Sequence, residues 1–373
     1  MRTRTRLLLI PAVAAVVALS GCGTTAPGPA SPAGSEQPGG TDPVSDPGGD
    51  GGPVAVTSAP PEPLVDLDCG DLGRVLDSTR YAGLSPREGT VVADAWDAFP
   101  IPLEDIVRNA GGVACEWSQG GTWYVKSGNS FELDASWYGA AVFVIPGGRA
   151  AKDAVYLDRS CGDDSWKSHG TTCADGKIVG DAFVHDVVGT HDRYDTIGAV
   201  GRATEAAVSA ARVAAGPIAR PAGTFAPPRA CLELVPRDVA EDVVGEKLDY
   251  ADVTSTTQDA ATATFYTEHI GCWYNGRTSK TFFEVRVYPG GGWMAEDRLA
   301  SWDGEAVEVD GMRDGDRAIE HCFRWPDGDK ETWCTLGLLV DGSWATVKVS
   351  ALKKDAASAG ARTIAAALLA HRS

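Results

Sequence analysis

Nine cysteines carry the first chemical signal in this sequence. A thiol can form a disulfide, bind zinc or act as a nucleophile, and the spacing of cysteines helps to separate these uses. No Cys-x-x-Cys pair occurs, so a zinc ribbon or a thioredoxin-type motif has no support. Two segments, CGDDSWKSHGTTC and CFRWPDGDKETWC, each hold eleven residues between their cysteines. The recurrence of this spacing indicates a structural unit that is present twice.

Cys22 differs from the other cysteines because it directly follows an export signal. Three arginines precede an apolar core at residues 7–19, which is shorter than the roughly 20 residues needed to span a bilayer. The core ends in LSGC, which resembles a bacterial lipobox, where the Cys thiol receives a diacylglycerol. We therefore predict a lipoprotein signal peptide at residues 1–21, lipidation of Cys22 and anchoring to the extracytoplasmic face of the bacterial cell membrane. The alternative is a plain secretory signal with an incidental cysteine.

The other eight cysteines form an even set, which in an exported protein predicts a disulfide framework. If each copy of the repeated unit is self-contained, each of its four cysteines has three pairing schemes open. We predict that the first cysteine of each copy pairs with the second, and the third with the fourth. This gives Cys69–Cys115, Cys161–Cys173, Cys231–Cys272 and Cys322–Cys334.

The charge of the chain limits its partners. The formal net charge is −18, and removal of the signal peptide would remove three arginines as well. Such a chain is repelled by phosphate backbones and by anionic lipid headgroups. We expect no nucleic-acid partner, and we expect the lipid rather than a basic patch to hold the protein at the membrane.

The repeat divides the chain into segments. Residues 22–64 are rich in Gly, Pro, Ser and Thr and lack Lys and Arg, which is typical of a disordered tether. The four cysteines of each copy recur at nearly constant offsets, and both copies contain an apolar strand pattern that ends in Pro-Gly-Gly. We predict a first domain at 65–216, a linker at 217–229 and a second domain at 230–373.

The predicted fold class is α+β, with two tandem homologous domains. Each would have a mainly antiparallel sheet, flanking helices and two disulfides. Gly-Asp and Asp-Gly between apolar runs, after Cys173 and Cys334, predict a hairpin in each copy. In the strand expected at 281–288, apolar residues alternate with Glu284 and Arg286, so we expect these two charged residues on a solvent-exposed face.

Other periodic segments predict further elements. We expect a helix at 236–244, with Pro236 near its start and Gly245 after its end, and a strand at 261–267. Helices are also expected after each Pro-Gly-Gly and in the Ala-rich end of each copy; these are 150–160, 294–302, 203–215 and 351–371.

The second copy resembles a group of known families. It opens with CLELVPRDVAEDVVG at Cys231 and contains GCW around Cys272. These elements resemble actinobacterial lipoprotein families of unknown function and, more loosely, the extracellular sensor domain of mycobacterial Ser/Thr kinases. The resemblance covers residues 229–371; the first copy, with CGDLGRVL at Cys69, lacks the Pro and the second Leu. The resemblance implies a surface lipoprotein with a ligand cleft or a partner face, and it implies no catalytic residues.

The sequence contains few residues whose types and spacing indicate catalysis or metal binding. His169, His185 and His191 lie in the first copy near acidic residues, but neither H-x-x-x-H nor HExxH occurs, so we predict no metal site and no cofactor. No G-x-S-x-G motif is present. The acidic segment 310–316 resembles a calcium loop, but Met312 and His321 stand where carboxylates are required.

The first copy contains an aromatic insertion at residues 120–140, around the turn-like Lys-Ser-Gly-Asn that ends at Asn129. We expect an extended hairpin there, whose rings could form a platform for an envelope glycan, a peptide or a partner protein. The alternative is that the rings pack against the protein itself. The candidate ligand-binding residues are Trp123, Tyr124, Phe131, Trp137 and Tyr138.

The sequence therefore predicts a binding or sensor-type lipoprotein of the cell envelope, with an unidentified ligand and no enzymatic activity. Two alternatives remain open. The protein could be a hydrolase that acts on the cell wall, or an accessory or structural subunit of an envelope complex.

Overall fold

The structure is a computed structural model. It describes residues 59–77, 79–87, 99, 101–119, 124–127, 130–133, 138–155, 157, 160–163, 171–190, 195–214, 216–253, 259–278, 281–296, 298–324 and 330–372. These residues all belong to one compact unit. The predicted signal peptide, Cys22 and most of the predicted tether lie outside them. Within the described part of the chain, no helix has the length and apolar character needed to cross a bilayer.

The first half of the chain builds a six-stranded antiparallel sheet in the order β1-β2-β5-β8-β7-β6. Its strands are β1 (Pro86–Arg87), β2 (Val113–Gln119), β5 (Tyr138–Ile145), β6 (Ser160–Asp163), β7 (Thr171–Val179) and β8 (Ala182–Thr190). A separate two-stranded hairpin, β3 (Tyr124–Ser127) and β4 (Ser130–Leu133), is inserted between β2 and β5.

The second half repeats this connectivity, because its sheet has the order β9-β10-β11-β15-β14-β13-β12. Its strands are β9 (Leu248–Val253), β10 (Ile270–Gly276), β11 (Phe282–Tyr288), β12 (Glu305–Ala306), β13 (Arg317–Arg324), β14 (Thr332–Val340) and β15 (Ser343–Ala351). β12 is an additional edge strand. The predicted α+β class with two antiparallel sheets is confirmed, and the shared strand order is what a duplicated unit predicts. The boundaries 65–216 and 230–373 stay predictions.

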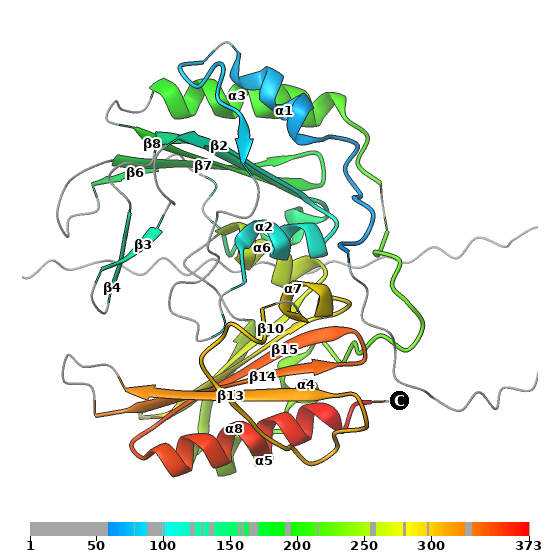
Figure 1. Ribbon diagram of the computed structural model, residues 1–373, viewed down its shortest axis with the longest axis vertical. Coiled ribbons are helices and arrows are strands. Elements are labelled where there is room, and N and C mark those ends of the chain that lie inside the picture. The colour runs from blue at the N-terminus through cyan, green and yellow to red at the C-terminus, as the bar shows by residue number, and fades with distance from the viewer. Residues whose placement is uncertain are drawn as a thin grey trace, which may run out of the picture. The chain divides into compact units, whose positions relative to one another are not determined.

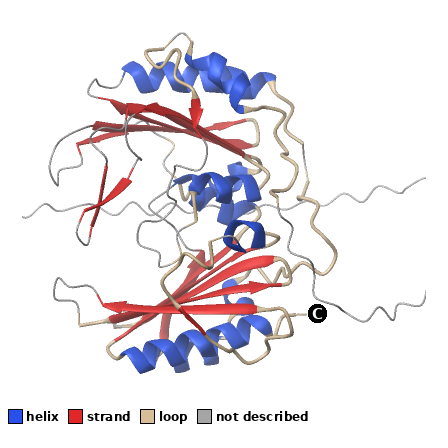
Figure 2. Ribbon diagram, viewed as in Figure 1, coloured by secondary structure: helices blue, strands red, loops and turns tan. Residues whose placement is uncertain are grey.

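Helices cover both faces of each sheet (Figure 1, Figure 2). The outer face of the first sheet carries α1 (Cys69–Leu76) and α3 (Asp195–Ala210), and that of the second carries α5 (Arg237–Val244) and α8 (Lys354–Leu369), with the short α4 (Cys231–Leu234) nearby. Four short helices lie between the two sheets. They are α2 (Leu103–Asn109), the 3-10 helix η1 (Gly148–Ala151), α6 (Asp259–Thr267) and α7 (Gly292–Glu296).

One hydrophobic cluster is shared by the two halves. Phe99 and Leu103 from the first half pack in the same cluster as Phe265, Met294 and Trp344 from the second. The helix α6 also crosses between the halves, because it packs against η1 and the first sheet. Burial of apolar surface between the sheets therefore holds both halves in one unit.

One glycine in the second sheet makes room for this shared core. A Cβ atom on Gly337 would lie 2.2 Å from the ring of Trp344 and 3.1 Å from that of Phe99. The absence of a side chain at this position of β14 thus lets rings from both halves pack against the strand.

Turns and caps follow the sequence closely. The turn between β14 and β15 has Asp341 and Gly342 at φ 43° and 72°, and the matching turn in the first half has Gly180 at φ 61°. Left-handed backbone of this kind is what Asp-Gly and Gly-Asp hairpins use, so both predicted hairpins are confirmed. Gly245 ends α5 at φ 71°, as expected of a residue after a helix.

Three expected elements are wrong. Residues 261–267 form part of α6 rather than a strand, because contacts with the first sheet outweigh the β propensity of their Thr, Phe and Tyr side chains. Among the described residues of 150–160, only the end of η1 is helical, and turns follow it at 152–154. At 294–302 the helix α7 ends at Glu296.

The helices at the end of each copy are present with shifted boundaries. The helix expected at 203–215 is α3, Asp195–Ala210, and that expected at 351–371 is α8, Lys354–Leu369. The helix expected at 236–244 is α5, which begins one residue later, with Pro236 as its N-cap residue.

Three of the predicted disulfides are present: Cys69–Cys115, Cys231–Cys272 and Cys322–Cys334. Cys173 is also disulfide-bonded, and it lies opposite Cys161 in the β6–β7 ladder. The side chain of Cys161 is outside the described part, so the Cys161–Cys173 bond stays a prediction.

Candidate ligand-binding surface

The aromatic insertion of the first half forms the expected hairpin. Tyr124 pairs with Leu133 and Ser127 with Ser130. Trp123 and Trp137 lie outside the described residues, and the side chains of Tyr124 and Phe131 are not described.

Tyr138 is the one candidate of this set whose ring can be placed. Its ring centroid lies 5.2 Å from that of Tyr81, and its hydroxyl donates to the Arg80 carbonyl oxygen at 3.0 Å. Tyr138 therefore packs against its own half, which was the alternative for these rings. Its neighbours leave it half-buried.

A second set of aromatic residues, which we did not predict, lies on the inner face of the second sheet. Strand register places these residues on one side, because Trp273 and Glu284, Glu284 and Lys348, and Trp333 and Phe323 are direct cross-strand neighbours. All are half-buried and therefore partly open to solvent. We call this set the aromatic face; its members are Trp273, Phe282, His321, Phe323, Trp333 and Lys348.

The rings of the aromatic face contact one another across the strands. Trp273 and Phe282 stack with centroids 4.6 Å apart and planes inclined at 20°. Phe282 meets Trp333 edge-on at 4.9 Å, and Lys348 Nζ lies 4.8 Å from the Trp333 ring centroid. Such contacts fix the orientation of each ring, so the face is organised before any ligand arrives.

Two polar groups on β14 have no hydrogen-bond partner among the described residues. They are Trp333 Nε1 and Thr335 Oγ1, and both atoms are buried. Thr335 is fully buried and lies directly opposite Lys348 and His321 in the strand register. Because buried polar groups are normally paired, these two mark a place where a further partner would be stabilising.

Glu284 and Arg286 are buried, so the expected exposed face of β11 is wrong. Their side chains are 5% and 9% exposed and form a two-point ion pair, with Nε–Oε1 at 2.9 Å and Nη2–Oε2 at 3.1 Å. Arg286 also lies 5.9 Å from the ring of Phe265 in α6. Each partner compensates the charge of the other away from water.

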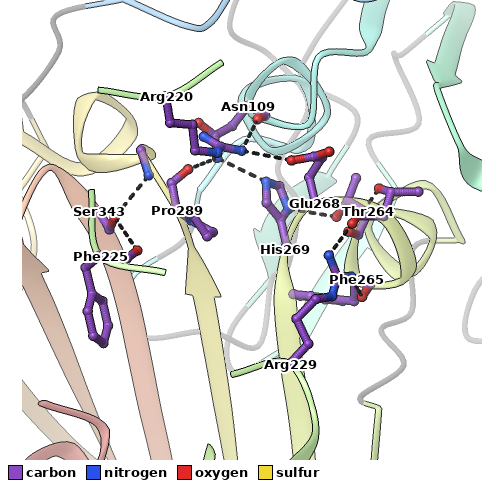
Figure 3. Close-up of polar contacts among 12 residues, drawn as sticks. Asn109, Arg220, Phe225, Arg229, Thr264, Phe265, Glu268, His269, Pro289 and Ser343 are labelled. Atoms are coloured by element: carbon purple, nitrogen blue, oxygen red, sulfur yellow. Dashed lines mark hydrogen bonds and ion pairs between the residues drawn. The ribbon is translucent and has the colours of Figure 1, made fainter. Parts of the chain in front are cut away.

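A polar seam joins the halves beside the shared core (Figure 3). Trp293 Nε1 donates to Asn109 Oδ1 at 3.2 Å, which leaves the Asn109 amide NH₂ to donate to His269 Nε2 at 3.0 Å and to the Pro289 carbonyl at 3.2 Å. His269 Nδ1 therefore carries the proton and donates to Thr264 Oγ1 at 2.9 Å. Burial lowers the pKa of His269 well below its ordinary value, and the nearby arginines of the linker lower it further. His269 is thus a neutral structural residue.

The predicted linker 217–229 is held within this seam. Arg220 donates to the Asn109 carbonyl at 3.1 Å and pairs with Glu268 at 3.6 Å, and Arg229 donates to the Phe265 carbonyl at 2.8 Å (Figure 3). Phe225 is buried in the core of the second half. The segment therefore fastens the halves together.

No family model and no curated protein matches the chain. The assignment of a site therefore depends on the geometry of the chain itself.

The histidines of the first half do not gather into a metal site in the described structure. His169 and His191 lie outside it, and His185 is buried between Phe143 and Phe183, at ring distances of 6.2 and 5.9 Å. Among the residues that the structure describes, no group of three His, Cys, Asp or Glu side chains is placed to hold a metal ion.

The acidic segment 310–316 also has a structural role. Arg372 binds both carboxylate oxygens of Asp316, at 2.5 and 2.7 Å, and donates to Asp341 at 2.8 Å. The carboxylate of Asp316 is therefore occupied by a cation of the protein. The segment forms one wall of a pocket of about 860 Å³ whose rim carries charges of both signs.

Sequence reasoning missed the aromatic face because its residues are spread over five strands. Trp273 was noted only as part of a motif, and Phe282, Phe323 and Trp333 are far apart in the chain. Their shared face depends on the strand order β10-β11-β15-β14-β13.

Proposed function

We propose that this protein is a lipid-anchored binding protein of the cell envelope and that the aromatic face is its ligand-binding surface. The observation that carries the proposal is the ordered set of half-exposed rings next to two unpaired buried donors. Aromatic side chains at such positions supply large contact areas with little loss of conformational entropy on binding.

The surroundings of the face support a binding role. The shared core and the polar seam hold its strands within one compact unit. In the first half, the positions equivalent to Trp273 and Trp333 are Glu116 and Thr172. The rings are therefore a property of the second copy and are not required by the fold that both copies share.

The sequence supports the anchoring part of the proposal through Cys22 and the tether. A lipid at Cys22 would keep the binding surface close to the envelope. Replacement of Cys22 by Ser is expected to abolish membrane fractionation and the lipid mass on the mature N-terminus. Unchanged fractionation, with no lipid mass on the wild-type protein, would show that the protein is not lipid-anchored.

The binding role is tested with the double variant Trp273→Ala/Trp333→Ala. We expect saturable binding of the purified protein to isolated envelope fragments to weaken at least tenfold, as for aromatic residues at the centre of an interface. The control is Leu352→Ala, which truncates an apolar side chain that is 58% exposed and lies outside the aromatic face. Circular dichroism and urea unfolding establish that each variant is folded.

The alternatives correspond to other results. A Trp123→Ala/Trp137→Ala variant that alone loses binding would move the ligand site to the hairpin of the first half. Turnover of wall polymers, lost on replacement of a single Ser, His or Asp, would make the protein a hydrolase. Co-purification with one membrane complex, without binding to any envelope fragment, would make it an accessory subunit.

A further inference from the structure

The aromatic face contains two buried groups that can donate hydrogen bonds, and they lie beside a lysine side chain. Trp333 Nε1 and Thr335 Oγ1 are buried without a partner among the described residues, and they lie two positions apart on β14, on the same side of the sheet. Lys348 lies opposite Thr335 in β15, and its ammonium group sits over the Trp333 ring. An indole N–H and an ammonium group can only donate hydrogen bonds, and a threonine hydroxyl can donate as well.

Donors that gather in this way select an acceptor. Bonds between such donors and an ionised carboxylate are stronger than bonds to a neutral oxygen. A carboxylate would also satisfy two polar groups at once, which a hydroxyl group, with its single oxygen, does less well. The subsite therefore favours a ligand with an acidic group next to a body that can cover aromatic rings.

The position of the face argues against an extended peptide as the ligand. Peptides that bind to sheets usually add a strand to an open edge. The rings of Trp273, Phe282 and Trp333 stand on β10, β11 and β14, each of which is paired on both sides. Recognition here must therefore use side chains alone, which suits a sugar, with its apolar C–H face and its rim of polar groups.

We propose that the aromatic face binds an acidic saccharide, with the sugar ring on Trp273, Phe282 and Trp333 and its carboxylate bound by Trp333 Nε1, Thr335 Oγ1 and Lys348. This inference rests on the proposed function and names the chemistry of the ligand.

The first copy lacks the elements of this subsite. The residues equivalent to Trp333, Thr335 and Lys348 are Thr172, Ala174 and Val187. These hydrogen-bond donors therefore occur in the second copy only. A structural role common to both copies would require them in both, whereas a ligand site requires them only once.

The test uses matched acid and amide ligands. The probes are an N-acetylglucosaminyl-N-acetylmuramic acid disaccharide, a glucuronic acid disaccharide, and the carboxamide of each, all measured by calorimetry with the mature protein. We expect at least one acid to bind about tenfold or more tightly than its amide, because a hydrogen bond to a charged group is lost in the amide. The probe that shows the difference identifies the source of the acidic sugar.

Thr335→Val is the variant that tests the subsite itself. Because Thr335 Oγ1 has no partner in the described structure, its removal is expected to leave the unliganded protein as stable as before or more stable. The same variant is expected to lose roughly tenfold in affinity for the acid and little for the amide. Thr346→Val, the same change at a buried threonine on the same face, is expected to leave the preference for the acid unchanged.

The outcomes separate this inference from the proposed function. Equal affinity for acid and amide, or a preference that Thr335→Val does not alter, would overturn the subsite while leaving the aromatic face as the binding surface. Binding of an envelope peptide, with none of the saccharides, would do the same. Binding to envelope fragments that survives the Trp273/Trp333 double variant would overturn both.

Discussion

The sharpest physical prediction concerns two adjacent buried residues of β8, His185 and Asp186, which face opposite sides of the first sheet. His185 points to the inner face among aromatic rings, and its Nδ1 has no hydrogen-bond partner among the described residues. Asp186 is fully buried and points to the outer face, beneath α3. The second copy carries Thr346 and Val347 at these positions.

Burial shifts the two groups in opposite directions. It lowers the pKa of His185 from 6.5 to about 4, although Asp175 opposes the shift. It raises the pKa of Asp186 from 3.8 to about 7; Thr204 and Lys177 oppose this, whereas Asp175, directly opposite on β7, adds to it. Near pH 5 both groups are therefore neutral in the folded protein, whereas both would be charged in the unfolded chain.

The signs follow from proton linkage. Between pH 4 and 6.5 the unfolded chain takes up a proton at His185 that the folded protein refuses, so this group costs stability as the pH falls. Over the same interval Asp186 is protonated to a smaller extent in the unfolded chain than in the folded protein. This group therefore adds stability as the pH falls. At about 1.4 kcal/mol for each pKa unit, each group changes the free energy of unfolding by ~3 kcal/mol over this interval. The two slopes cancel in the wild-type protein.

Single substitutions taken from the second copy should expose each slope. Relative to wild type, His185→Thr is expected to gain ~3 kcal/mol of unfolding free energy between pH 6.5 and 4, and Asp186→Val to lose a similar amount. The double variant should follow the pH profile of wild type, because both slopes are then absent. The neutral His269 contributes equally to all four proteins, so differences from wild type remove its effect.

The assay is urea unfolding at several pH values from 4 to 7.5. The absolute stability of each variant is irrelevant to the test; only the change with pH counts. Parallel profiles for the wild type and both single variants would refute the reasoning, because they would mean that neither residue is held neutral by burial.

Further predictions concern the contacts that fasten the molecule. Asn109→Ala should lower the free energy of unfolding by about 3 kcal/mol, because it leaves His269 and other buried partners unpaired; a loss below about 0.5 kcal/mol would mean that the seam contributes little. Arg372→Ala should cost about 2–3 kcal/mol at neutral pH, since the half-buried carboxylates of Asp316 and Asp341 lose their charged hydrogen-bond donor. A variant as stable as wild type would contradict this ion-pair network. Cys322→Ala/Cys334→Ala should lower the free energy of unfolding by roughly 3 kcal/mol according to the chain-entropy model. The comparison is with the wild-type protein, with and without reductant. Equal stability of the reduced and the oxidised wild-type protein would exclude a stabilising role for the disulfides.

Several features were predictable from the sequence because they depend on short-range chemistry. The Asp341-Gly342 turn and the Gly245 cap need left-handed backbone, which few other residues adopt at little cost. The cysteine spacing predicted three bonds that the structure contains, and the repeat predicted two sheets of the same class.

Other features could not be read from the chain. Glu284 and Arg286 alternate with apolar residues, as an exposed strand face does, yet their part of the inner face is buried, and Arg286 lies 5.9 Å from the ring of Phe265 in α6. Residues 261–267 have strand-like composition, but α6 is stabilised by packing against the first sheet, which is remote in sequence.

The sequence alone therefore determined three of the disulfide pairings, the α+β class with two antiparallel sheets, and the turns, because each of these depends on residue type and local spacing. Only the tertiary structure decided which faces are covered and which rings meet. Trp273, Phe282, Phe323 and Trp333 form one surface because non-consecutive strands pair side by side. No local pattern encodes that pairing, since hydrogen bonds and burial across the whole sheet select it.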